Sequence, residues 1–136
     1  MPSTEEPRSD RQTLAVAISN AVVQVVRDHT GRGPTQARTY MADDLVTSVL
    51  RDTLTKGERT LVEHGRHKQV LDTRAEWQDT MESELTDAVE ALTERKVIAY
   101  LSQNHIDPDL GVETFVLERL PTEADPDVAI KSHGTA

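Results

Sequence analysis

The 136-residue sequence contains no cysteine and only four aromatic residues, Tyr40, Trp77, Tyr100 and Phe115. The missing cysteines exclude disulfides, thiol nucleophiles and thiolate metal sites, and they argue against a disulfide-stapled secreted scaffold. With so few aromatic rings, the core must be built mainly from Val, Leu, Ile and Ala. A chain of this length supports one small domain and not two.

Long apolar segments are also missing. The longest uninterrupted aliphatic run is the five residues from Leu14 to Ile18, whereas a membrane-spanning helix requires about 20. The first ten residues contain no apolar stretch of the kind found in signal peptides. We therefore expect a soluble protein that stays in the cytoplasm.

Charge is unevenly distributed along the chain. The formal net charge is −9, from 15 basic and 24 acidic residues, which opposes binding to nucleic-acid phosphates and to anionic lipid. Residues 69–94 carry eight acids and one base, whereas residues 27–68 carry eight bases and six acids. We interpret the acidic segment as a solvated helix face, and the asymmetry as one that could orient a partner.

Apolar spacing predicts a first helix that ends near His29 and is stopped by Gly31. Its main stripe recurs at spacings of three and four and consists of Leu14, Ile18, Ala21, Val22, Val25 and Val26. Val16 and Val23 fall on the opposite side of this helix. An isolated amphipathic helix would not carry this second strip, so either another layer of the same chain or a second subunit covers it.

The remaining pattern predicts two hairpins separated by two helices. Residues 36–41 and 45–51 form strands around a turn at 42–44, and Thr55 with Glu58 forms a capping box for a short helix that Gly65 closes. Residues 67–93 form a long helix that has Trp77 on its apolar face. Residues 96–102 and 112–118 form the second strand pair.

This order, αββ-α-αββ, predicts an α+β fold. We expect a two-layer sandwich with a mostly antiparallel four-stranded sheet and helices on one face; the strand order stays open. Thr47 to Leu50 match Thr114 to Leu117, which suggests a duplicated helix-plus-hairpin unit. The domain is predicted to cover residues 12–120, with residues 1–11 and 121–136 as flexible tails.

Candidate chemistry is sparse. Asp43 and Asp44 are adjacent carboxylates on a hairpin turn, and His105, Asp107 and Asp109 alternate, so a metal-dependent hydrolase is one hypothesis. Turn chemistry is the favoured interpretation because Asp and Pro are common in turns. The sequence has no P-loop, His-Glu-x-x-His, Gly-x-Ser-x-Gly or dinucleotide-binding motif. We therefore expect no catalytic residues, no cofactor and no metal.

A third group of residues suggests nucleic-acid binding, although the net charge opposes it. The bases that could contact phosphates are Arg32, Arg38, Arg51, Arg59, Arg66 and Lys68.

Several motifs together resemble the small bacterial and archaeal family called MpsC-like, over about residues 14–118. The motifs are Gly31, Gly33 and Pro34 after the first helix, Asp43-Asp44 before a strand, Thr55 with Glu58, and Asp107-Pro108-Asp109 before the last strand. The family typically has a glycine where this chain has Asp52-Thr53, and often one where it has Glu94. These departures fall in turns.

The resemblance implies association with a Na⁺-translocating, membrane-potential-generating system, and it supplies no catalytic residues. We therefore expect a non-enzymatic accessory or regulatory protein that docks on membrane subunits, with nucleic acid an improbable partner. We also expect a homodimer whose interface uses Val16 and Val23. The alternative is a small homodimeric nucleic-acid or ligand-binding module.

Overall fold

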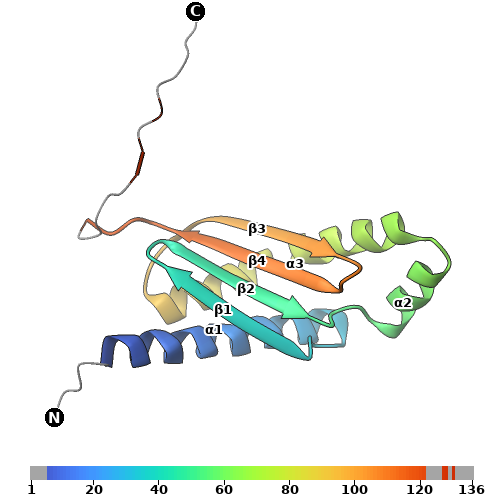
Figure 1. Cartoon of the computed structure of the whole chain (residues 1–136), viewed down its shortest axis with the longest axis horizontal. Coiled ribbons are helices and arrows are strands. Elements are labelled where there is room, and N and C mark those ends of the chain that lie inside the picture. The colour runs from blue at the N-terminus through green and yellow to red at the C-terminus, as the bar shows by residue number, and fades with distance from the viewer. Residues whose placement is uncertain (1–5, 122–126, 129, 131–136) are drawn as a thin grey trace, which may run out of the picture.

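Three helices and one four-stranded sheet make up the computed structural model, which describes residues 6–121, 127–128 and 130 (Figure 1). The elements are α1 (Glu6–Thr30), β1 (Gln36–Ala42), β2 (Leu45–Arg51), α2 (Lys56–Glu63), α3 (His67–Thr93), β3 (Val97–His105) and β4 (Leu110–Leu117). The α+β class and the αββ-α-αββ order are confirmed.

The strand order is β1-β2-β4-β3, and every neighbouring pair is antiparallel. The two hairpins therefore meet through β2 and β4. Thr47 lies opposite Thr114 at this junction, with 3.3 Å between their hydroxyl oxygens. An approximate two-fold axis perpendicular to the sheet at this point relates α1-β1-β2 to α3-β3-β4, as the duplication hypothesis requires.

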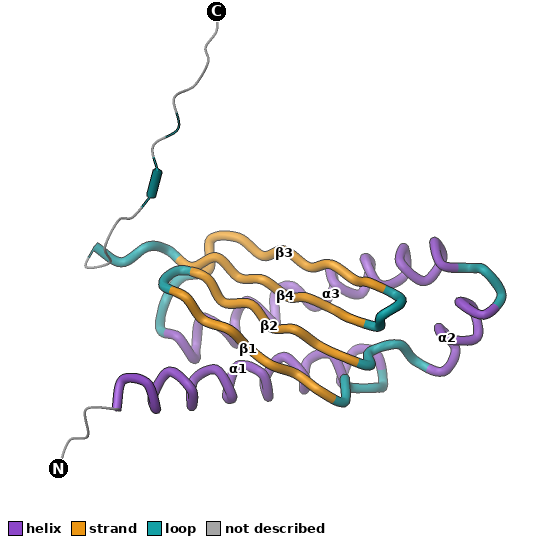
Figure 2. The backbone as a smooth tube through the Cα atoms, in the orientation of Figure 1, coloured by secondary structure: helices purple, strands orange, loops and turns teal. Residues whose placement is uncertain are grey.

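Both long helices pack on the same face of the sheet and against each other, while α2 lies beyond one end of the sheet (Figure 2). The core fills the space between these two layers. Its buried members are Ile18, Val22 and Val26 from α1, Met81, Leu85 and Val89 from α3, and Val46, Leu50, Phe115 and Leu117 from the sheet. Trp77 packs against this cluster, as its position on the apolar face of the helix indicated.

Two boundaries differ from those expected. Helix α1 begins at Glu6, so residues 6–11, which were expected in a tail, extend the helix by more than a turn. The second hairpin is also longer than expected, because pairing continues to His105 and Leu110 around a turn with a cis Asp107–Pro108 bond. Asn104 and Gly111 pair there despite low strand propensity. The tails predicted at residues 1–5 and over most of 121–136 lie outside the described residues.

We expect Leu85→Ala to lower the free energy of unfolding by about 2–5 kcal/mol, because Leu85 is fully buried between α3 and the sheet. Urea unfolding followed by circular dichroism measures the loss. Leu71→Ala is the matched control, since Leu71 lies on the same helix and is 38% exposed. An equal loss in both variants would contradict this placement of the core.

Candidate functional site

One face of the sheet is uncovered by any described helix. Side chains alternate along the strands, apart from a register shift at Ile98 in β3, and the paired positions place four outward residues on each of the four strands, sixteen in all. We call these sixteen positions the outer face. From the β1–β2 turn towards the β3–β4 turn, its rows are Ala42, Leu45, Val116 and Ala99; Tyr40, Thr47, Thr114 and Leu101; Arg38, Val49, Val112 and Gln103; and Gln36, Arg51, Leu110 and His105.

The outer face has an unusual composition for this chain. None of its sixteen residues is Asp, Glu or Lys, although the chain has 24 acidic residues. Three of its large side chains are well exposed: Tyr40 is 51% exposed, Leu45 is 41% and Leu101 is 58%. The guanidinium of Arg38 lies 5.0 Å from the centre of the Tyr40 ring. Depletion of Asp, Glu and Lys, with Tyr and Arg retained, is typical of protein–protein contact surfaces.

The two residues of the second apolar strip of α1, Val16 and Val23, differ in how far the rest of the chain covers them. Val23 is half-buried, and its methyl group lies beside Gly33, where an added Cβ would be 3.4 Å from it. The loop after α1 therefore covers this end of the strip. Val16 remains 60% exposed. The predicted interface at Val16 and Val23 stays a prediction.

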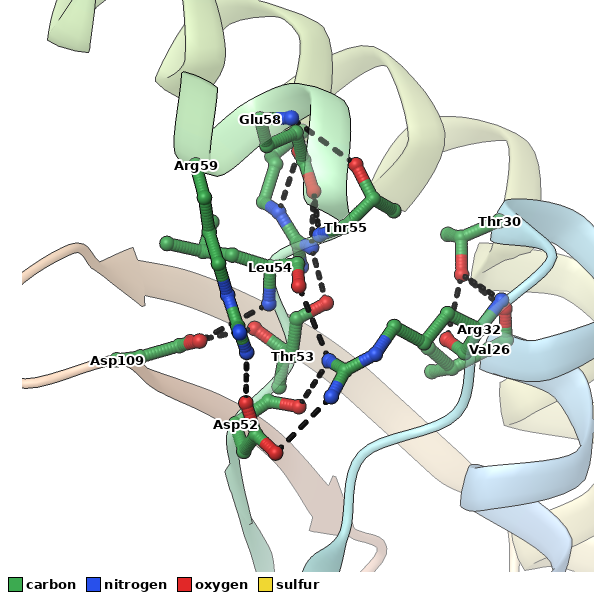
Figure 3. A network of polar contacts seen from close by, with 11 residues as sticks. Val26, Thr30, Arg32, Asp52, Thr53, Leu54, Thr55, Glu58, Arg59 and Asp109 are labelled. Carbon is green, nitrogen blue, oxygen red and sulfur yellow. Dashed lines mark hydrogen bonds and ion pairs between the residues drawn. The ribbon is translucent and has the colours of Figure 1, made fainter. Parts of the chain in front are cut away.

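Three of the family-motif residues, Thr55, Glu58 and Asp109, belong to a polar network at the end of the sheet near α2 (Figure 3). Thr55 and Glu58 make the predicted capping box, with Glu58 N donating to Thr55 Oγ1 at 3.1 Å and Thr55 N donating to the Glu58 carboxylate at 2.7 Å. Asp109 accepts hydrogen bonds from Thr53 Oγ1 at 2.9 Å and from Leu54 N at 3.0 Å. These bonds fasten the β3–β4 turn to the connection between β2 and α2.

An ion pair inside the molecule completes this network. Arg74 of α3 donates to both carboxylate oxygens of Glu58 at 2.7 and 2.9 Å, and it also donates to Thr53 O at 2.6 Å. Both charged side chains are less than one-tenth exposed. Arg74 lies 5.7 Å from the centre of the Trp77 ring. Because Glu58 caps α2 and pairs with α3, one carboxylate fixes the position of both helices.

Residues at the loop after α1 tie that loop to the same region. Gly31 has a φ of +79°, a left-handed conformation that ends the helix. Arg32 donates to Asp52 O at 2.6 Å and to the Asp52 carboxylate at 3.0 Å, and Arg59 also pairs with Asp52. The hydrogen bond from Arg32 lowers the pKa of Asp52.

The inner face of the sheet contains a polar row that crosses all four strands. The strand register pairs its members in the order Thr39, Ser48, Glu113 and Ser102. Ser19 of α1 extends it, with hydroxyl oxygens 2.7 Å apart in Ser19–Thr39 and 2.8 Å apart in Thr39–Ser48. Glu113 is 3% exposed and accepts a hydrogen bond from Tyr100.

Burial raises the pKa of Glu113. Burial, and then the nearby Glu113 carboxylate, raise the pKa of Tyr100 as well. A cavity of about 10 Å³, which has room for one water molecule, lies between Glu113 and Arg74. This cavity is too small to hold an organic substrate.

The carboxylates proposed for metal or acid–base chemistry do not converge. Asp43 and Asp44 form the β1–β2 turn, at the opposite end of the sheet from Asp107 and Asp109 in the β3–β4 turn. Nδ1 of His105 is 2.8 Å from Pro108 O. Among the described residues, no three His, Asp or Glu side chains gather closely enough to hold a metal ion.

The bases considered for nucleic-acid binding are divided among three places. Arg38 and Arg51 lie on the outer face. Arg32 and Arg59 are engaged with Asp52. The remaining two, Arg66 and Lys68, lie at the start of α3, beyond α2. They do not form one continuous patch.

Sequence reasoning missed the outer face, Arg74 and Glu113. A signal for Glu113 was present, because it shares the alternating face of Phe115 and Leu117, both of which are apolar. Arg74 likewise falls one turn from Val70 on the apolar face of α3. A charged residue at a core position predicts a buried partner, but the partner's identity requires the tertiary structure.

Comparison with known families finds one match. Residues 10–119 match the family model described as Na⁺-translocating membrane potential-generating system (MpsC). No curated protein and no solved structure matches the chain. None of the described helices combines the length and hydropathy that crossing a bilayer requires.

Arg74→Met should lower the free energy of unfolding by about 3–5 kcal/mol, because it leaves the Glu58 charge buried without its partner. Chemical unfolding measures this loss. Lys68→Met is the control on the same helix: its partner Asp72 is 2.7 Å away, but both side chains are exposed, so little change is expected. Similar stabilities for the two variants would contradict the anchoring role of Arg74.

Glu113→Gln should stabilise the protein progressively as pH rises. The raised pKa of Glu113 means that the folded state binds this proton more tightly than the unfolded state. The stability that the protonated carboxyl contributes is fully present below its ordinary pKa, and it is lost as pH rises through the raised value. Gln keeps the neutral form at every pH. Urea midpoints for the wild type and the variant should therefore agree near pH 4 and separate by pH 8.

The control for this titration is Glu76→Gln, because Glu76 is exposed on α3. This variant removes one negative charge from an exposed position, so it measures the effect of the charge alone on the urea midpoint over the same pH range. A difference for Glu113→Gln that does not grow with pH beyond that of Glu76→Gln would contradict the role of burial at Glu113.

Proposed function

Because the chain belongs to the MpsC family, we propose that it is a non-enzymatic accessory or regulatory component of a Na⁺-translocating, membrane-potential-generating system. It acts at the cytoplasmic side by binding other protein subunits. The observation that carries the proposal is the outer face: an uncovered sheet surface without a single carboxylate or lysine. Such a surface suits protein contact better than it suits solvent.

The bonds of three carboxylates in the polar network support a non-enzymatic role. The carboxylate oxygens of Glu58 accept hydrogen bonds from the N-cap of α2 and from Arg74. Those of Asp109 accept hydrogen bonds from the β2–α2 connection. Asp52 is held between two arginines. A general acid or base must be free to exchange a proton with a substrate, whereas these groups hold segments of the chain together.

The apolar half of the outer face supports protein as the partner. Its two rows nearest the β1–β2 turn contain Leu45, Val116, Tyr40 and Leu101, with threonines between them. Burying exposed aliphatic and aromatic surface is the main favourable contribution to protein association. The arginines at the other half can then form the polar part of the contact.

The test is affinity purification of the tagged protein from gently solubilised native cells, with mass spectrometry of the accompanying proteins. The wild type should retain polytopic subunits of an ion-translocating system, and Thr114→Glu, which puts a charge at the centre of the outer face, should lose them. Val16→Glu is the matched control, because Val16 is exposed on α1 away from this face. Recovery of the wild type without any membrane subunit would contradict the proposed function.

A further inference from the structure

We infer that the outer face binds the outer face of a second copy of this chain, so that two sheets stack into a symmetric dimer. This inference rests on the proposed function, in which the outer face is a protein-contact surface, and it identifies a second copy of the chain as the protein that covers this face. The membrane subunits then bind the dimer, and Thr114→Glu loses them because it separates the two copies.

The size of the outer face suits a dimer. Strands lie about 4.8 Å apart, and outward residues on one strand are about 6.8 Å apart, so four strands and four rows cover roughly 19 by 27 Å. That is about 500 Å² in projection, and side chains that rise from the sheet increase the accessible area further. A standard stable interface buries about 800 Å² on each partner. The outer face and its rim therefore supply an area of the required order.

The chemistry of the outer face is self-complementary. Consider a two-fold axis that lies between the two sheets, parallel to the strands and over the β2–β4 junction. It sets β1 against β3 of the second copy, and β2 against β4. The register then brings Tyr40 over Leu101 of the second copy, and Leu45 over Val116 of the second copy. Apolar residues meet apolar residues in both halves of the contact.

The same operation keeps like charges apart. Arg38 comes over Gln103 of the second copy, and Arg51 comes over Leu110 of the second copy. Because the outer face has no carboxylate, no acidic residue of one copy is buried beneath the other. Thr47 and Val49, which lie near the axis, face Thr114 and Val112 of the second copy. These short side chains allow two sheets to approach to the usual 10 Å or so.

Other occupants fit the outer face less well. A nucleic acid would require several cations, but this surface has two arginines, one histidine and one tyrosine for base stacking. A second copy through α1 would use Val16 alone, because the loop at Gly33 already covers Val23. The sheet face offers a much larger apolar surface than the α1 strip.

The experiment is sedimentation of the purified protein over micromolar to submillimolar concentrations. The wild type should have twice the mass of one chain. Thr114→Glu and Thr114→Lys should each sediment as monomers, because two copies would bring like charges together at the centre of the interface. An equimolar mixture of these two variants should recover the dimeric mass. Thermal unfolding followed by circular dichroism tests whether each variant is folded. We expect both to be folded, because Thr114 points away from the core.

Val16→Glu is the control, and it should remain dimeric. A dimer that Val16→Glu breaks and Thr114→Glu leaves intact would overturn the inference in favour of an α1 interface. A monomeric wild type would also overturn it, and binding of a single-stranded oligonucleotide by that monomer would assign the outer face to nucleic acid. If the protein is monomeric but still copurifies with membrane subunits, the inference fails while the proposed function stands. If the protein is dimeric but copurifies with no membrane subunit, the inference stands while the proposed function fails.

Discussion

The pairing of β2 with β4 is the contact on which the rest of the molecule depends. Each half of the chain is one helix and one hairpin, and an isolated two-stranded hairpin is only marginally stable in water. Joining the hairpins through β2 and β4 makes a four-stranded sheet that two helices can cover. The approximate two-fold axis at Thr47 and Thr114 is perpendicular to the sheet, so it keeps α1 and α3 on the same side. The same symmetry that builds the core therefore leaves the outer face bare.

The buried polar row makes the strand pairing within each hairpin specific. Hydroxyls of Ser19, Thr39 and Ser48 contact one another in a chain, and Glu113 contacts Tyr100 beside it. A slip of one strand would separate these groups and leave them buried without partners, which costs about 1–3 kcal/mol for each group. The row contributes less apolar burial than valines or leucines would, but it penalises incorrect registers. At the end of the sheet, Glu58 and Arg74 fix α2 and α3 in the same way.

The elements that could be predicted from the sequence are those with a strong period or a local signal. The apolar stripe of α3 and the capping box at Thr55 gave bounds and contacts that the structure confirms. The extension of the second hairpin could not be predicted, because Asn104 and Gly111 have low strand propensity and pair only through their neighbours. The outer face also could not be predicted from the sequence. Alternation along β4 separates Val112, Thr114 and Val116 from Phe115 and Leu117, but both sets contain large apolar residues, and only the packing of the helices shows which set they cover.

The distribution of charge links the fold to the proposed contacts. Two copies that each carry a net charge of −9 repel one another at long range. The acids of α3 lie on its solvent side, so a helix of about 10 Å diameter stands between them and the sheet. In the surrounding solvent, interactions between exposed charges are largely screened beyond the Debye length, which is about 8 Å at physiological ionic strength. The outer face, which has no carboxylate and two arginines, is therefore the direction in which a second negatively charged chain approaches with the least repulsion. In the proposed dimer, the acidic helices lie on the two outer sides, where further partners can reach them.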